Sequence, residues 1–185
     1  MKLATARIDG TATVVAEVPG RNTVVLLDSV YDAAGLGNPP HTLKELLQRG
    51  EGEINAVEHA VAAVGPQFGI PAENMVFLPP IPDPGKVLGV AMNNVRLNNT
   101  AHVEPAGPMF FLKPPSSLIG HEAPIEIYAD YGFTFPELEV GVIIGRRAKH
   151  VSETDALHYV AGYTIVNDIT SVSYTHLTLP TKRIV

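Results

Sequence analysis

Apolar and polar residues alternate along the first part of the chain and are interrupted by turn signals. Residues 2–18 alternate around the pair Asp9–Gly10, which is typical of a hairpin turn between two strands. Residues 22–27 contain four consecutive apolar residues and predict a further strand. The pattern therefore predicts at least three strands before any helix.

Two helices are predicted after these strands. Thr42 has Glu45 three residues later, which is the spacing of a capping box, and the helix that it opens ends near Gly50. A second helix follows, because apolar residues recur at helical spacing until Gly65; they are Ile54, Val57, Ala60, Val61 and Val64. Residues 1–77 are thus expected to form a small α/β accessory domain.

A proline-rich segment separates this region from a second one. Residues 78–85 contain four prolines, which disfavour both helix and central strand, so we predict a linker there. Beyond it, residues 86–92 and 110–112 are apolar and predict strands. Residues 125–127 alternate and predict another strand.

The most informative stretch spans residues 135–170. Glu137 and Glu139 precede the apolar run 140–144, which is typical of a largely buried strand. Side chains alternate across a strand, so both glutamates are expected on one face. Ser152, with Asp155 three residues on, predicts a short helix. Residues 163–166 form a second apolar strand that leads to Asp168.

If these two strands pair, three carboxylates converge at one rim: Glu137, Glu139 and Asp168. Such hard oxygen ligands suit Mg²⁺, Mn²⁺ or Ca²⁺ better than zinc, which prefers nitrogen and sulfur. The alternative is a solvated strand face, which is the more common origin of alternating charge. Two observations favour a metal site: the glutamates adjoin a core-like apolar run, and no lysine or arginine alternates with them.

Three motifs occur in order between residues 86 and 170: FFLKPPS from Phe110, ELEVGVIIG from Glu137, and DALHYVAGYTIVND from Asp155. Their order and spacing resemble those of the fumarylacetoacetate hydrolase family. The resemblance implies a β-roll catalytic domain with a divalent-metal site, usually for Mg²⁺ or Mn²⁺. Carried over residue by residue, its ligands fall on Glu137, Glu139 and Asp168.

The family's first strand usually leads into G-x-N-Y-x-x-H, whose histidine acts as a general base. Here Asn93 matches the asparagine, but Asn94 replaces the tyrosine and Leu97 stands where the histidine is expected. His102 could substitute for it, and Arg96 could bind a substrate carboxylate bidentately. For both, an ordinary surface residue is the alternative. This departure weakens the prediction of hydrolysis more than that of the metal site.

Composition narrows the possible functions. The chain has 185 residues, 45% hydrophobic and 17% charged, which indicates a folded protein. A net charge of −6 disfavours nucleic-acid and anionic-membrane partners. The absence of cysteine excludes disulfides and a thiol nucleophile. We see neither a signal peptide nor an apolar run of membrane-spanning length, so a cytoplasmic protein is expected.

The last residues change in character. Residues 172–181, VSYTHLTLPT, resemble the translation of a transposase adapter used in sequencing libraries. The alternative is a genuine strand at residues 174–179. We therefore predict a non-native tail at 172–185 and a truncated catalytic domain at 86–171. The parent enzyme is expected to be longer and homodimeric, and this fragment to be inactive by itself.

The expected fold is α+β and β-rich, with the small N-terminal domain followed by the first part of the β-roll domain. The resemblance implies a metal-dependent hydrolase that cleaves a carbon–carbon bond in a β-dicarbonyl, acylpyruvate-type 2-oxo acid, in aromatic catabolism. Its cofactor would be Mg²⁺, or Mn²⁺ or Ca²⁺. The alternatives are an isomerase, decarboxylase or dehydratase on the same metal scaffold, and a non-catalytic binding relative.

Overall fold

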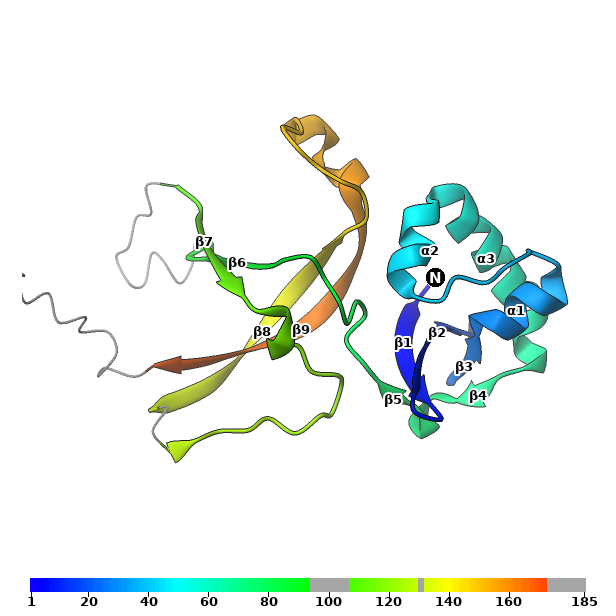
Figure 1. The fold of residues 1–185 in the computed structure, drawn as a ribbon, viewed down its shortest axis with the longest axis horizontal. Helices are drawn as coiled ribbons and strands as arrows, with labels where there is room; N and C mark the ends of the chain where they lie inside the picture. The colour runs from blue at the N-terminus through cyan, green and yellow to red at the C-terminus, as the bar shows by residue number, and fades with distance from the viewer. Residues whose placement is uncertain (94–106, 130–131, 173–185) are drawn as a thin grey trace, which may run out of the picture. The chain divides into compact units, whose positions relative to one another are not determined.

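The computed structural model describes residues 1–93, 107–129 and 132–172. The chain divides into two compact units, Met1–Ala123 and Pro124–Val185. Figure 1 shows the helices gathered in the first unit and a long two-stranded ladder in the second. We describe each unit by itself.

The first unit is built on a five-stranded sheet of order β4-β3-β2-β1-β5, in which all neighbours are antiparallel. Asp9 and Gly10 form the turn between the first two strands, with φ values of 49° and 82°. This left-handed geometry is that of a tight hairpin turn, so the predicted turn is confirmed. The strands are β1 (Leu3–Ile8), β2 (Thr11–Glu17), β3 (Thr23–Leu26), β4 (Ile70–Pro71) and β5 (Val76–Phe77).

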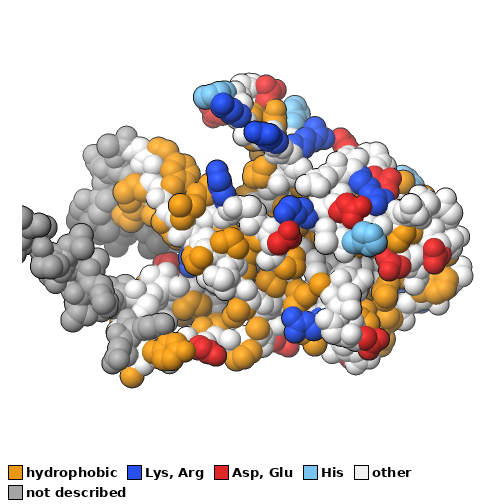
Figure 2. Space-filling view, in the orientation of Figure 1, with side chains coloured by type: hydrophobic (Ala, Val, Ile, Leu, Met, Phe, Trp, Pro, Cys, Tyr) orange, Lys and Arg blue, Asp and Glu red, His pale blue; other side chains and the backbone are white. Residues whose placement is uncertain are grey.

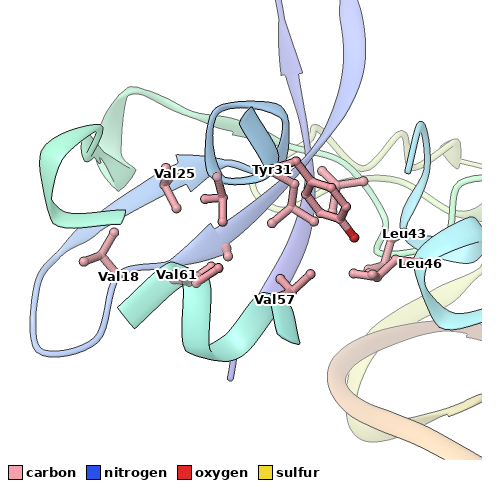
Figure 3. Packing of buried hydrophobic residues seen from close by; sticks show 12 residues of the cluster. Val18, Val25, Tyr31, Leu43, Leu46, Val57 and Val61 are labelled. Atoms are coloured by element: carbon pink, nitrogen blue, oxygen red, sulfur yellow. The ribbon is translucent and has the colours of Figure 1, made fainter. Parts of the chain in front are cut away.

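Three helices pack against one face of this sheet: α1 (Leu27–Ala34), α2 (Leu43–Arg49) and α3 (Glu51–Val64). Figure 3 shows Tyr31 of α1 beside Leu43 and Leu46 of α2, while Val61 of α3 lies toward Val18, which follows β2, and Val25 of β3. The core that results also includes Val14, Ala16, Leu27, Val30, Val57 and Ala60. A smaller apolar cluster around Ala6, Val15 and Val24 covers the other face.

The N-cap bond predicted for α2 is confirmed, and the return bond of Glu45 reaches His41, one residue before the N-cap. The Glu45 backbone N–H donates to Thr42 Oγ1 (3.0 Å), and the Glu45 carboxylate accepts from the backbone N–H of His41 (2.9 Å). The helix ends at Arg49, and Gly50 follows with φ 91°. Both ends of α2 therefore lie where the sequence placed them.

Helix α1 was not predicted. The strand expected over residues 22–27 ends at Leu26, and Leu27 already begins the helix. Leu26 occupies the N-cap position and gives no side-chain cap, so the usual sequence signal for a helix start is missing. The unbroken apolar run conceals the change from strand to helix.

The proline-rich segment lies along the N-terminal sheet. Leu78 donates its backbone N–H to Thr5 O (2.9 Å), and the Thr5 hydroxyl donates to Pro80 O (2.7 Å). Lys44 pairs with Asp83 at 2.9 Å. This segment is therefore fastened to the first unit at three points.

Two predicted strands follow it and form a separate antiparallel ladder, β6 (Val87–Ala91) with β7 (Met109–Lys113). Short 3₁₀ turns in the first unit span Gly65–Gln67, Ala72–Asn74 and Pro115–Ser117. In the described ranges no helix is long and apolar enough to cross a membrane.

In the described residues of the second unit there is one antiparallel ladder, β8 (Phe133–Ile144) with β9 (Val160–Val172). Between them lies a 3₁₀ helix, Glu153–Tyr159, capped by Ser152. The Ser152 hydroxyl accepts from the Asp155 backbone N–H (3.2 Å) and donates to its carboxylate (2.6 Å). The short helix predicted at Ser152 is present, in 3₁₀ form.

Two expectations for this unit were wrong. Residues 125–127 are not a strand. The run 140–144 is a strand but is not buried: Val140 is 70% exposed and Ile144 57%. Within the described part of the unit two strands pair alone, and a single ladder cannot cover both of its own faces. The overall architecture is α+β and sheet-rich, as predicted.

Candidate metal centre

The pairing of β8 with β9 places the three predicted carboxylates on one face of the ladder. Glu137 lies directly opposite Asp168, and Glu139 lies opposite Val166. Directly opposed residues share a face in an antiparallel pair, and so do residues two apart on one strand. Glu137, Glu139 and Asp168 therefore project from the same side.

Carboxylates on the same face of a ladder can still be too far apart to bind a single ion. Among the residues that the structure describes, no three aspartate, glutamate or histidine side chains come close enough together to hold one ion. Glu137 and Glu139 are exposed, and Asp168 is half-buried. The structure thus aligns the candidate donors along the ladder without gathering their oxygens at one position.

A fourth residue joins this row. The Thr170 hydroxyl donates to Glu137 Oε2 at 2.8 Å, across the ladder and diagonally, since Thr170 itself pairs with Phe135. Thr170 was not among the predicted site residues. The available signal was its position two residues after Asp168, which places a threonine on the carboxylate face.

Gly141 shapes the ladder beside Glu139. A Cβ at this glycine would lie 2.8 Å from a methyl group of Thr164 and 2.8 Å from a methyl group of Val166. Val166 is the residue that faces Glu139. Because Gly141 has no side chain, the methyl groups of Thr164 and Val166 can occupy the space beside Glu139.

The opposite side of the same ladder is hydrophobic. Val140 faces Ile165 and Val142 faces Tyr163. We call this side the apolar face; its members, all exposed, are Leu138, Val140, Val142, Tyr163 and Ile165. The ladder thus separates carboxylates on one side from large hydrophobic side chains on the other. Figure 2 shows further hydrophobic side chains at the visible molecular surface, beside charged groups of both signs.

The donor set fits a hard divalent cation. All three candidate ligands are carboxylates, and oxygen donors are what Mg²⁺, Mn²⁺ and Ca²⁺ take. Neither histidine nor cysteine belongs to the row, so its chemistry does not favour zinc or copper. Glu137, Glu139 and Asp168 are the side chains that could hold such an ion.

The other predicted site residues are Asn93, Arg96 and His102. Asn93 follows β6 and is exposed. Arg96 and His102 fall outside the described residues. The roles assigned to these three side chains stay predictions.

Comparison with known proteins adds a family match. The family model described as the C-terminal part of fumarylacetoacetate (FAA) hydrolase matches residues 86–181. The match begins at the first residue of the predicted catalytic domain and extends into residues 172–181. The non-native origin proposed for those last residues stays a prediction.

Similar proteins include enzymes with different reactions. The mitochondrial oxaloacetate tautomerase of Rattus norvegicus is 33% identical over 133 residues, which span 71% of this chain and 42% of that protein. A solved fumarylacetoacetate hydrolase from Exiguobacterium antarcticum is 26% identical with a TM-score of 0.66, over 92% of this chain and 56% of the other.

A third similar structure contains a metal ion. Maleylpyruvate hydrolase from Sphingobium sp. SYK-6, solved with manganese(II) and pyruvate, is 22% identical with a TM-score of 0.66, over 91% of this chain and 59% of the other. At that identity the likeness concerns the fold. The chain spans less than half the length of the tautomerase and under two thirds of each solved structure.

Proposed function

Because this chain belongs to the fumarylacetoacetate hydrolase family, we propose that its protein is a divalent-metal-dependent enzyme acting on 2-oxo acids. The observation that carries the proposal is the facing pair Glu137 and Asp168, with Glu139 on the same side of the ladder. Like charges that lie directly opposite each other on paired strands are destabilising, and a bound cation would relieve this repulsion.

The substrate that we propose is an acylpyruvate, a 2-oxo acid with a second carbonyl in the β position. A solved relative of the same fold contains manganese(II) and pyruvate, and pyruvate is a product expected from cleaving such a substrate. A bound divalent ion would polarise the 2-oxo group and offset negative charge that develops on it.

The reaction that we propose is hydrolysis of a carbon–carbon bond. Water adds its oxygen to the distal carbonyl carbon, and the bond between that carbon and C3 of the pyruvyl part breaks. The electron pair of this bond passes into the enolate of pyruvate, which takes up a proton. The products are a carboxylic acid and pyruvate, so no oxidant or reductant is needed.

In this proposal each protein residue has a separate part. Glu137, Glu139 and Asp168 hold the cation. Asn93 and Arg96 are proposed to bind substrate, and His102 to accept a proton from water. The role of Asn93 rests on the sequence motif, and those of Arg96 and His102 rest on residue type and sequence position.

A second candidate is keto–enol tautomerisation of a 2-oxo diacid. The similarity to oxaloacetate tautomerase favours it, and so does Leu97 at the position where the family's hydrolases have a histidine. Tautomerisation moves a proton between C3 and the carbonyl oxygen and consumes no water. It therefore needs no water-activating base.

The test uses the full-length gene product and separates metal binding from chemistry. Mn²⁺ binding is measured by electron paramagnetic resonance of the free ion. Glu137→Ala and Asp168→Ala should each weaken binding by more than the roughly 10–100-fold expected from losing an outer-shell partner. Glu153→Gln, in the 3₁₀ helix of the same unit, is the matched control and should bind as the wild type does.

Activity is then followed with acetylpyruvate and with the enol form of oxaloacetate. Pyruvate release from acetylpyruvate that requires Mg²⁺ or Mn²⁺ supports hydrolysis. Metal-dependent decay of the enol without carbon–carbon cleavage supports the tautomerase instead. Unaltered Mn²⁺ binding in both alanine variants, or full turnover after chelation, would overturn the proposed metal site.

A further inference from the structure

We propose that Thr170 is a positioning residue for the metal centre: its hydroxyl fixes one oxygen of Glu137 so that the other is presented to the ion. This inference rests on the proposed function, because it needs Glu137 to be a ligand. It adds a side chain that is neither an acid nor a base, and it assigns the two oxygens of Glu137 to different partners.

The geometry of the ladder supports this assignment. Thr170 Oγ1 lies 2.8 Å from Glu137 Oε2, a distance suited to a hydroxyl donating to a carboxylate. Asp168 stands directly opposite Glu137, and Thr170 is the next residue of β9 on that face. Glu137 is therefore held from the side that leads away from Glu139.

A long exposed glutamate needs such a partner if it is to bind an ion well. Its side chain has several rotatable bonds, and their freedom must be given up when the ion binds. A hydrogen bond made beforehand removes part of that freedom. In metal proteins, ligating carboxylates are usually hydrogen-bonded in turn for this reason.

A purely structural role for the hydroxyl is the competing explanation, and the ladder offers a control for it. Thr134 lies on β8 and its hydroxyl bonds the hydroxyl of Ser171 at 3.0 Å. That contact also links β8 to β9, but on the face away from Glu137. Thr134→Val therefore removes the same kind of cross-strand bond without touching a candidate ligand.

The experiment compares Thr170→Val, Thr170→Ser and Thr134→Val in the full-length protein. Valine has nearly the shape of threonine and suits a strand equally, so the fold is retained. We expect Thr170→Val to raise the Kd for Mn²⁺ by about 10-fold or more. Thr170→Ser keeps the hydroxyl and should restore most of the affinity, while Thr134→Val should leave it unchanged.

Thermal unfolding of the apo proteins provides the second readout. If the hydroxyl only braces the hairpin, Thr170→Val and Thr134→Val will lower the melting temperature alike and leave Mn²⁺ affinity equal; that result would overturn the inference. Wild-type affinity in Thr170→Val, while Glu137→Ala has lost binding, overturns it too and leaves the proposed metal site standing. Absence of Mn²⁺ binding in the wild type would overturn both.

Discussion

At the scale of single residues, Tyr31 joins the three helices of the first unit. It is fully buried, and its hydroxyl donates to Glu53 Oε1 at 2.6 Å. Arg49 also bonds this carboxylate and lies over the Tyr31 ring, 6.0 Å from its centroid. Burial, and then the bond to Glu53, raises the pKa of the Tyr31 hydroxyl far above its ordinary value. Tyr31 thus stays neutral and donates at any ordinary pH.

We predict that Tyr31→Phe lowers the free energy of unfolding by about 1–2 kcal/mol at neutral pH, because a hydrogen bond to a charged acceptor is lost. The measurement is urea unfolding followed by circular dichroism. Tyr128→Phe is the control, since the Tyr128 hydroxyl is exposed and bonds Glu126, two residues away. A Tyr31→Phe protein as stable as the wild type would contradict the prediction.

The hydrogen bond between Tyr31 and Glu53 also predicts that the free energy of unfolding depends on pH. The Tyr31 hydroxyl, and then Arg49, hold the pKa of Glu53 below its ordinary value in the folded state. A lowered carboxyl pKa stabilises the fold above the unfolded-state pKa, about 4.3, and this stabilisation is lost as the pH falls through the folded-state pKa. The stability gap between wild type and Tyr31→Phe should therefore narrow below about pH 4.3. A gap that stays constant down to pH 3 would contradict this.

Residue-level features were predictable where partners are close in sequence. The capping pairs at Thr42 and Ser152 span three residues, and both were found. The Tyr31–Glu53 and Thr170–Glu137 bonds join residues 22 and 33 apart. Such pairs form only where particular helices or strands pack together, and the local spacing of residues in the sequence does not reveal which of them do.

At the scale of elements, the β8–β9 ladder depends on a glycine that strand propensity would disfavour. Gly141 faces Thr164, and the methyl groups of Thr164 and Val166 occupy the space where a side chain would begin. Any larger residue must displace those methyl groups, which belong to the second strand.

We predict that Gly141→Ala destabilises the ladder by about 1–3 kcal/mol through overpacking, although alanine costs less backbone entropy than glycine. Thermal unfolding monitored by circular dichroism measures it. Gly162 lies on the partner strand with nothing within 4 Å of its ideal Cβ, so Gly162→Ala is the matched control and should be neutral or stabilising. Equal effects of the two substitutions would show that the close approach is unimportant.

Strands were predictable where apolar and polar residues alternate or where apolar residues form a continuous run. The strands β6, β7, β8 and β9 lie where alternation or an apolar run predicted them. The alternation at residues 125–127 did not become a strand, because three residues carry little pairing energy without a neighbour. Helix α1 was not predicted, because no capping residue separates it from β3.

At the scale of the whole molecule, the most conspicuous feature is that the apolar face of the β8–β9 ladder is exposed to water. Leu138 is 84% exposed and Ile165 80%, which is unusual for residues of a strand with this composition. Burial could not be predicted from the run 140–144, because periodicity identifies the strand but not the layer that packs on it. Strand alternation, in contrast, predicted a shared face for the three carboxylates if the two strands pair, and the observed pairing confirms that face.

We predict that residues 1–185 bind a hydrophobic dye and self-associate, because exposed apolar faces pair with one another in water. Sedimentation velocity over a range of concentrations measures this. The double substitution Val140→Thr and Ile165→Thr keeps strand propensity and should reduce both dye binding and association. Leu157→Thr removes an exposed leucine outside this face and serves as the control. Monomeric wild-type protein that binds no dye would contradict the prediction.

The fastening of the proline-rich segment determines where the chain can be divided for expression. Thr5 is 4% exposed, and its hydroxyl has Pro80 O as acceptor. A recombinant N-terminal piece that stopped at Phe77 would remove this acceptor and the Leu78 bond to β1 together. The loss of these two hydrogen bonds would cost about 1–3 kcal/mol. A piece that ends after Asp83 keeps both bonds and the Lys44 ion pair, so it should express in the soluble fraction when the shorter one does not.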